Sequence, residues 1–331
     1  MSWIEEADEI RRRREMALAH GGNDAVNRQH EKGRLTIRER IELLVDKGSF
    51  EEVGPAAGSG LRDENGELVG FDPANFILGF GKINDQRIVV GGEDFTVRGG
   101  SPSPAGLRKS VYTEELALQY RLPLVRLHEG AGGSIGGTGG KGENLPGPVF
   151  ATPRFKSVAE CMATVPVATA ALGAVAGLPA ARLVASHFSV MSKATAQIMT
   201  AGPAVVERAM GEKITKDELG GWKVHTKNGT VDNAGEDEAD SLAQIRRFLS
   251  YLPPNVDTLA PVTANDDPVD RAEEPLLDIV PRERRRAFDM RRVLKLVLDT
   301  ESFFEMGAGY GRSQIVGPVS YTHLRAHETI H

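Results

Sequence analysis

Gly177, Leu178 and Pro179 lie where a buried strand is expected to meet a helix, and this junction could do chemistry. The preceding residues 165–175 are mostly small or apolar, and Pro179 would lie in the first helical turn, where its missing N–H costs little. N–H groups at a helix start lack partners and attract negative charge. If those of Gly177 and Leu178 face a pocket, they could stabilise an enolate oxyanion. A packed turn without a ligand is the alternative.

A second segment, residues 128–142, is rich in glycine and could approach a ligand closely. Gly137 to Gly142 match the pattern G-x-G-x-x-G, but a dinucleotide site needs that pattern to open a helix directly after a strand. Here a segment with two prolines follows, and Lys141 is followed by Gly rather than Ser or Thr, so the phosphate-binding P-loop fails too. A strand over residues 122–127 leading into a flexible loop remains, and composition alone favours a surface insertion.

His327 and His331 enclose a glutamate in the pattern H-E-x-x-H, in which two histidines one helical turn apart bind zinc. His331 is the last residue of the sequence, so no third ligand follows it. We therefore predict no metal site. Ser186-His187 and His225 are more typical of structural positions than of a nucleophile with its base.

Composition excludes several classes of protein. The formal net charge of −6 and a pI near 5.8 give no basic field for nucleic acid, although local basic patches could hold a phosphate. The single cysteine, Cys161, cannot form an internal disulfide, which favours a reducing compartment and a cytoplasmic location. The N-terminal segment mixes acidic and basic residues unlike a signal peptide, and prolines interrupt the longest uncharged run, so no membrane span is expected.

An internal repeat indicates how the chain is organised. Residues 38–54 and 291–307 share an amphipathic helix, an Asp, a Ser-Phe pair and a Glu-x-Gly end. Asp46 corresponds to Asp299 and Gly54 to Gly307 at one constant offset, since 299 − 46 = 307 − 54 = 253. Such self-similarity indicates duplicated structural units.

Strand and helix patterns alternate through the first unit, which predicts an α/β layered domain. Apolar segments at 76–82 and 87–91 are typical of strands, and 108–120 and 204–212 are typical of helices. We expect an N-terminal helix over 1–27, a complete domain over 28–256, a linker over 257–286 and the start of a second domain over 287–317. Residues 318–331 do not continue the repeat, so we expect a truncated protein with a non-native tail.

Several short motifs follow one another in order over residues 28–316. They are His30 to Thr36 (HEKGRLT), Asp94 to Ser101 (DFTVRGGS), Glu218 to Gly221 (ELGG), Phe248 to Pro254 (FLSYLPP), Ile279 to Pro281 (IVP) and Phe303 to Gly311 (FFEMGAGYG). Together they are more specific than any one of them, and they resemble the carboxyltransferase (β) subunits of biotin-dependent acyl-CoA carboxylases of the propionyl- and methylcrotonyl-CoA type.

The resemblance implies two crotonase-like domains in tandem, each a spiral of β-β-α units, with the first complete and the second only begun. It implies transfer of a carboxyl group from carboxybiotin to the α-carbon of an acyl-CoA, through an enolate held by backbone oxyanion holes. The first hole carries over to Gly177 and Leu178, where Leu replaces the family's usual second glycine. Gly99, Gly100 and Ser101, and the loop of Gly132 and Gly133, match the family's loops beside acyl-CoA and biotin.

No Met-Lys-Met biotinylation motif occurs, so biotin should arrive on a biotin carboxylase or carrier partner. The resemblance also implies a homo-oligomer built from dimers, a hexamer at full length. Two alternatives remain: a subunit of a biotin-dependent acyl-CoA decarboxylase, and a non-catalytic module that binds CoA or the carrier.

Overall fold

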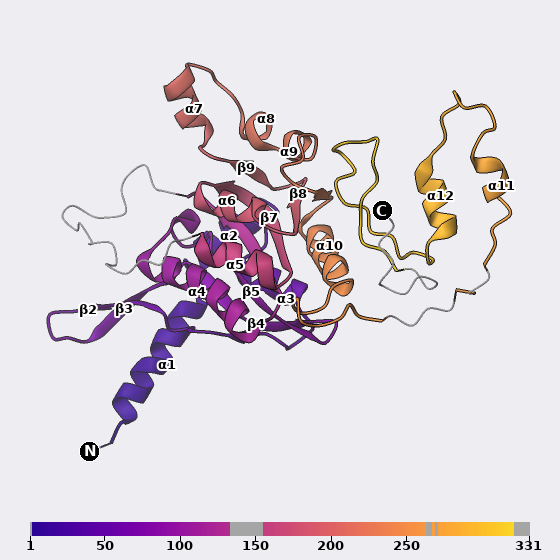
Figure 1. The fold of residues 1–331 in the computed structure, drawn as a ribbon. Helices are drawn as coiled ribbons and strands as arrows, with labels where there is room; N and C mark the ends of the chain where they lie inside the picture. The colour runs from indigo at the N-terminus through magenta and orange to yellow at the C-terminus, as the bar shows by residue number, and fades with distance from the viewer. Residues whose placement is uncertain (1, 133–154, 263–266, 269–270, 321–331) are drawn as a thin grey trace.

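A mixed eight-stranded sheet forms the centre of the protein in the computed structural model, which describes residues 2–132, 155–262, 267–268 and 271–320 (Figure 1). Its order is β1-β4-β5-β6-β7-β8-β10, with β9 paired to β7. Only β1 and β4 run antiparallel to their neighbours β4 and β5; the remaining pairs are parallel. The strands are β1 (Glu51–Glu52), β4 (Phe76–Ile83), β5 (Gln86–Glu93), β6 (Leu124–Gly130), β7 (Val167–Ala176), β8 (Phe188–Ser192), β9 (Gln197–Met199) and β10 (Asn233–Gly235).

Helices cover both faces of this sheet because its strands carry apolar residues on both sides. In β5, Ile88 and Val90 pack under α3 (Ile37–Leu44) and α10 (Glu238–Ser250), whereas Val89 packs on the opposite face. That face carries α4 (Pro104–Tyr120), α5 (Lys156–Thr164) and α6 (Leu178–Val184). The α/β layering predicted from the sequence is therefore confirmed.

Smaller elements surround these layers. Helix α1 (Ile4–Leu18) extends away from the sheet and contacts the hairpin of β2 (Gly58–Arg62) and β3 (Leu68–Pro73) (Figure 1). The other elements are α2 (Asn23–His30), the 3₁₀ turn η1 (Arg98–Gly100), α7 (Pro203–Met210), α8 (Lys216–Gly220), α9 (Trp222–His225), α11 (Leu276–Ile279) and α12 (Met290–Val297). No helix within the described part of the chain has the length and apolar character needed to cross a membrane.

The sequence repeat has a counterpart in the structure. Helix α12 occupies the positions of α3 shifted by 253 residues (290 − 37 = 297 − 44 = 253). Arg38 pairs with Glu52 in the first copy, and Arg291 pairs with Glu305 in the second, at the same offset (291 − 38 = 305 − 52 = 253). Because even an ion pair recurs at the same offset, the two segments are duplicated copies of one structural unit.

The extended part of the second copy packs on the first unit. Phe304 is buried against the rings of Phe188 and Tyr251. Arg247 of α10 donates hydrogen bonds to the carbonyls of Glu301 and Phe303. The segment after α12 therefore completes the core beneath α10.

Candidate functional site

Three glycine-containing turns meet at the carboxyl ends of β5, β6 and β7. The N–H of Ala131 donates to the carbonyl of Gly99 over 3.0 Å, which joins the turn after β5 to the loop after β6. A Cβ on Gly100 would lie 2.6 Å from the Glu129 carbonyl, and one on Gly132 would lie 2.7 Å from the Ala176 carbonyl. A side chain at either glycine would push the turns apart. Because both residues are glycine, the turns can pack together and line this surface with backbone atoms.

The structure thus brings together Gly99, Gly100, Gly132, Gly177 and Leu178, which come from three separate segments of sequence. Ser101 continues the first turn, and its carbonyl accepts a hydrogen bond from the Asn75 amide. Gly133 and the H-E-x-x-H segment lie outside the described residues.

The two predicted oxyanion donors differ in their hydrogen bonding. The Gly177 N–H donates to the Met199 carbonyl at the end of β9, over 3.3 Å. The Leu178 N–H opens α6, and no described residue accepts a hydrogen bond from it. Gly177 itself has φ 67° and ψ −129°, which only glycine adopts readily. Leu178 is therefore the donor left available at this junction.

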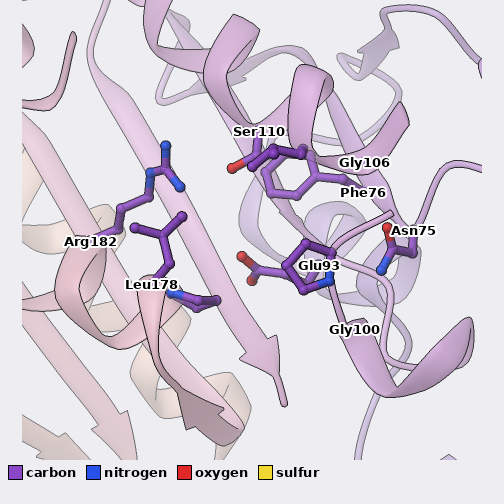
Figure 2. Close-up of a pocket in the computed structure, with 11 residues that line it drawn as sticks. Asn75, Phe76, Glu93, Gly100, Gly106, Ser110, Leu178 and Arg182 are labelled. Atoms are coloured by element: carbon purple, nitrogen blue, oxygen red, sulfur yellow. The ribbon is translucent and has the colours of Figure 1, made fainter. Parts of the chain in front are cut away.

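Beside Leu178 lies a small, open pocket with about 30 Å³ of free space. Figure 2 shows Leu178 and Arg182 on one wall, with Phe76 and Ser110 facing them. The lining mixes apolar Phe76, Leu107, Leu178 and Pro179 with polar Asn75, Glu93, Ser110 and Arg182. At this size the pocket has room for a water molecule or a group of similar size.

Glu93 directs its carboxylate into this pocket and also contacts His128, with 3.1 Å between Oε2 and Nδ1 (Figure 2). Burial alone would raise the pKa of Glu93, but the charge and hydrogen bond of His128 outweigh it, and the pKa lies below its ordinary value. His128 is buried, and its Nε2 has no partner among the described residues. Glu93 is consequently a fixed negative group at the pocket wall.

Arg182 belongs to a buried cluster around Glu114. Its Nε donates to Glu114 over 2.9 Å, and Arg126 pairs with the same carboxylate oxygen. Ser157 donates to the other oxygen of Glu114. Arg182 is only 3% exposed, yet no described residue accepts a hydrogen bond from its Nη2.

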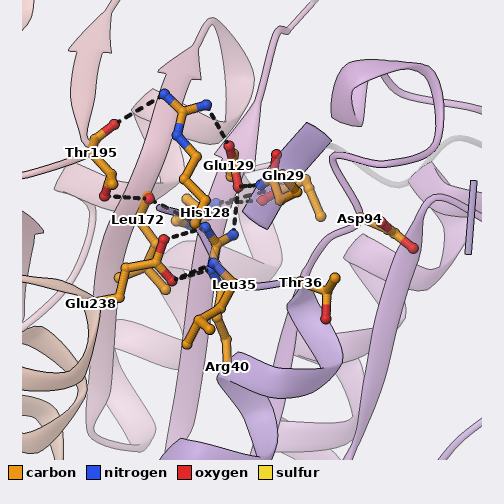
Figure 3. Close-up of polar contacts among 12 residues, drawn as sticks. Gln29, Leu35, Thr36, Arg40, Asp94, His128, Glu129, Leu172, Thr195 and Glu238 are labelled. Atoms are coloured by element: carbon orange, nitrogen blue, oxygen red, sulfur yellow. Dashed lines mark hydrogen bonds and ion pairs between the residues drawn. The ribbon is translucent and has the colours of Figure 1, made fainter. Parts of the chain in front are cut away.

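A second buried network anchors the glycine loop that follows β6. Glu129 accepts from Arg34 over 3.0 Å and pairs with Arg40 over 2.6 Å, and Arg40 also pairs with Glu238 of α10 (Figure 3). Burial raises the pKa of Glu129, although the two arginines oppose that shift. The amide of Gln29 completes the contacts. Glu129, the residue just before Gly130, is therefore held directly by Arg40 of α3 and by the N-terminal segment, and Glu238 of α10 holds Arg40 in turn.

A third feature is a basic pocket beside Gly99 with about 320 Å³ of free space. Its lining includes Arg28, Lys32 and Arg98 together with Phe95. Neither Arg28 nor Lys32 forms an ion pair with any described residue. Such a pocket suits a ligand that carries phosphate.

Other chemistry finds no support among the described residues. No group of three His, Cys, Asp or Glu side chains could hold a metal ion there. His187 Nδ1 accepts the Val167 N–H, and His225 contacts the Ile198 carbonyl over 2.7 Å, so both take structural positions as expected. Burial, reinforced by Glu114, raises the pKa of Cys161 to about 12, which keeps its thiol neutral.

Sequence reasoning missed Glu93, Arg182 and the anchors of Glu129. One signal was present, because Glu93 and Arg126 interrupt or end strongly apolar segments. Charged residues at such places are rarely buried unless they are paired.

Comparison with known proteins adds an independent observation. Residues 28–318 match the family model for the carboxyl transferase domain. The carboxyltransferase subunit of propionyl-CoA carboxylase from Haloferax mediterranei is 32% identical over 96% of the chain and 60% of the relative. The mitochondrial propionyl-CoA carboxylase beta chain of Homo sapiens is 33% identical over 94% of the chain and 57% of the relative. The chain thus spans about three fifths of these relatives.

Solved structures give the same result. Transcarboxylase 12S, with methylmalonyl-coenzyme A bound, superposes with a TM-score of 0.79 at 26% identity, over 95% of this chain and 60% of that one. A single-chain, multi-domain long-chain acyl-CoA carboxylase gives 0.76 at 28% identity, over 96% of this chain and 31% of that one.

Proposed function

The chain belongs to the carboxyl transferase domain family, and from this premise we propose that it acts in transfer of a carboxyl group between biotin and the α-carbon of an acyl-CoA. Its fold is the crotonase-like α/β fold of these carboxyltransferases, as the sequence predicted. The observation that carries the proposal is the Leu178 N–H, which donates to no described residue and lies beside a pocket at a junction that glycines leave open.

In the proposed reaction the Leu178 N–H holds the thioester oxygen of the acyl-CoA. When the α C–H bond breaks, its electron pair enters the enolate and negative charge moves onto that oxygen. A fixed N–H directed at developing charge stabilises it, and losing one such donor typically costs about 10²–10³ in rate. Leucine serves as well as glycine here because the donor is the backbone N–H. The leucine side chain changes only the shape of the adjoining pocket.

Carboxybiotin, brought by a carrier partner, would release CO2 as its N1–carboxyl bond breaks. The N1 of biotin would then take up the α-proton, and the enolate carbon would form its new bond to CO2. The glycine turns suit an approach of this kind, since a Cβ on Gly100 or Gly132 would fill the space where the turns meet. The network around Glu129 would hold this surface in place. A homo-oligomer and a biotin-carrying subunit are the partners we propose.

The CoA phosphates would bind the basic pocket of Arg28, Lys32 and Arg98, which adjoins the glycine turn at Gly99. We expect R28Q/K32Q to weaken CoA binding about tenfold, because each exposed ion pair contributes up to about 1 kcal/mol. The double variant K47Q/K227Q, with two exposed lysines outside this pocket, should bind as the parent does.

Isothermal titration of the chain with CoA, with acyl-CoA and with a biotinylated carrier tests the proposal. A carboxyltransferase or a decarboxylase subunit should bind CoA esters and the carrier. Binding of the carrier alone would identify an assembly module instead, and binding of neither would reject the family's activity for this chain.

A further inference from the structure

Arg182 ties helix α6, which presents the Leu178 N–H, to a fixed carboxylate. Its Nε donates to Glu114 of α4 over 2.9 Å, and both side chains are buried. Within the described part of the chain this is the only hydrogen bond or ion pair of the Arg182 side chain, and its Nη2 is buried without a partner. The connection between α6 and α4 through this side chain therefore depends on one contact.

Glu114 is itself held by partners from two further elements. Arg126 of β6 pairs with the oxygen that also accepts from Arg182, and Ser157 of α5 donates to the other oxygen. Arg126 donates in addition to the Ser110 carbonyl over 2.8 Å. The Glu114 carboxylate consequently offers α6 a fixed point of attachment.

Helix α6 needs such a point because its other contacts do not fix its orientation. It has seven residues, too few to be stable without tertiary contacts, and Gly177 at its N-cap forms no side-chain hydrogen bond. Ala180 and Leu183 pack in an apolar cluster, but apolar contacts are not directional. A hydrogen bond is directional, so the bond to Glu114 determines how α6 lies against α4.

The position of α6 matters for the chemistry because Leu178 lies on the same helix, four residues before Arg182. The two residues are about 6 Å apart along the axis and share one pocket wall (Figure 2). The pocket has room for a group of the size of a thioester oxygen. A displacement of the Leu178 N–H by about 1 Å would take it beyond hydrogen-bond distance from that oxygen.

Neutralisation of charge does not explain Arg182. Glu114 retains Arg126 when Arg182 is removed, and Glu93 at the pocket wall has its own contact with His128. Replacement of Arg182 therefore leaves neither carboxylate without a partner, and chains with that replacement should fold.

We propose that Arg182 is a positioning residue for the carboxyl transfer: through Glu114 it places the Leu178 N–H where that N–H meets the thioester oxygen. In this role Arg182 does not touch the acyl-CoA. The inference rests on the proposed function and adds to it a residue that acts through another.

The variants Arg182→Gln and Arg182→Met test the hydrogen bond to Glu114. Both remove the guanidinium, but glutamine places an N–H donor at the position of Nε, where methionine places a methyl group. With acetyl-CoA labelled with ¹³C at the thioester carbonyl, we expect the infrared stretch of that carbonyl to fall on binding to the parent and to Arg182→Gln. Arg182→Met should lose at least half of this shift and still bind the ester within about tenfold of the parent, the range for one hydrogen bond.

Arg38→Met is the matched control. Arg38 also lies on a short helix, pairs with the Glu52 carboxylate over 2.7 Å and has a buried Nε without a partner. Glu52 retains Lys109, so this replacement leaves no carboxylate unpaired either. Because Arg38 lies outside the pocket, the variant should show the full infrared shift, although urea unfolding should reveal a loss of stability similar to that of Arg182→Met.

A full shift in Arg182→Met, or loss of the shift in Arg182→Gln, overturns this inference while the proposed function stands. The glutamine result decides the question if the methionine variant does not fold. An equal loss in Arg38→Met also overturns the inference, because the effect then follows stability and not position. A parent chain that binds no CoA ester, or binds it without a shift, rejects the proposed role of the Leu178 N–H and the inference with it.

Discussion

Gly132 shows at the scale of one residue how the site depends on missing side chains. Its φ is 70°, and a Cβ would meet the Ala176 carbonyl at 2.7 Å. Gly48 has a similar φ of 73°, but a Cβ there would meet nothing within 4 Å. A comparison of substitutions at Gly132 and Gly48 therefore distinguishes the cost of backbone strain from the cost of separating the turns.

We expect Gly48→Ala to lower the free energy of unfolding by about 1–2 kcal/mol, the cost of a left-handed alanine. Gly132→Ala should cost about 1–3 kcal/mol more, since the turns must also move apart. It should weaken acyl-CoA binding, which Gly48→Ala should leave unchanged. Urea unfolding and titration measure both effects. Equal behaviour of the two variants would contradict the packing of the turns described above.

At the scale of elements, most strands and helices followed from local patterns. The apolar segment 165–175 corresponds to β7, and the junction at Gly177 to the start of α6. The positions of these elements can be predicted from nearby glycine and proline residues and from the spacing of apolar residues. The buried ion pairs were not predictable in this way, because Arg40 and Glu238 lie 198 residues apart and only the tertiary fold brings them together.

Lys109 joins α4 to the turn after β1, and it makes this connection sensitive to pH. Its ammonium donates to the Gly54 carbonyl over 3.1 Å and lies 3.7 Å from Glu52. Burial lowers the pKa of Lys109 to about 8, despite the opposing Glu52 carboxylate. Above pH 8 the folded protein has released this proton, whereas the unfolded chain keeps it up to the ordinary pKa of 10.5.

The unfolded state thus binds more protons in this window, and stability contributed by Lys109 rises with pH, by at most about 1.4 kcal/mol per unit. Urea unfolding at pH 7.5 and pH 9 should give a less positive change for Lys109→Met than for the parent. Identical changes in the two proteins would show that this lysine titrates as a solvated one.

At the scale of the whole molecule, the second copy of the repeat is tied to the first. Phe304 enters the core under α10, and the N–H of Gly307 donates to the Asn233 side chain. The repeat was visible in the sequence, but the packing of its second copy on the first was not. A constant offset shows which residues correspond, and it does not show where the two copies lie in space. The glycine turns likewise came from three distant segments whose meeting required the complete sheet.

The thioester carbonyl of a bound acyl-CoA reports most directly on this site, because its infrared stretch falls when an N–H donates to it. With ¹³C-labelled valeryl-CoA, the chain should lower this frequency relative to free ligand. Leu178→Ala keeps the N–H and should preserve the shift. Leu178→Pro removes the N–H at a position in the first helical turn that tolerates proline. The account predicts that the shift disappears in Leu178→Pro while the ester still binds; a full shift in that variant, or none in the parent, would contradict it.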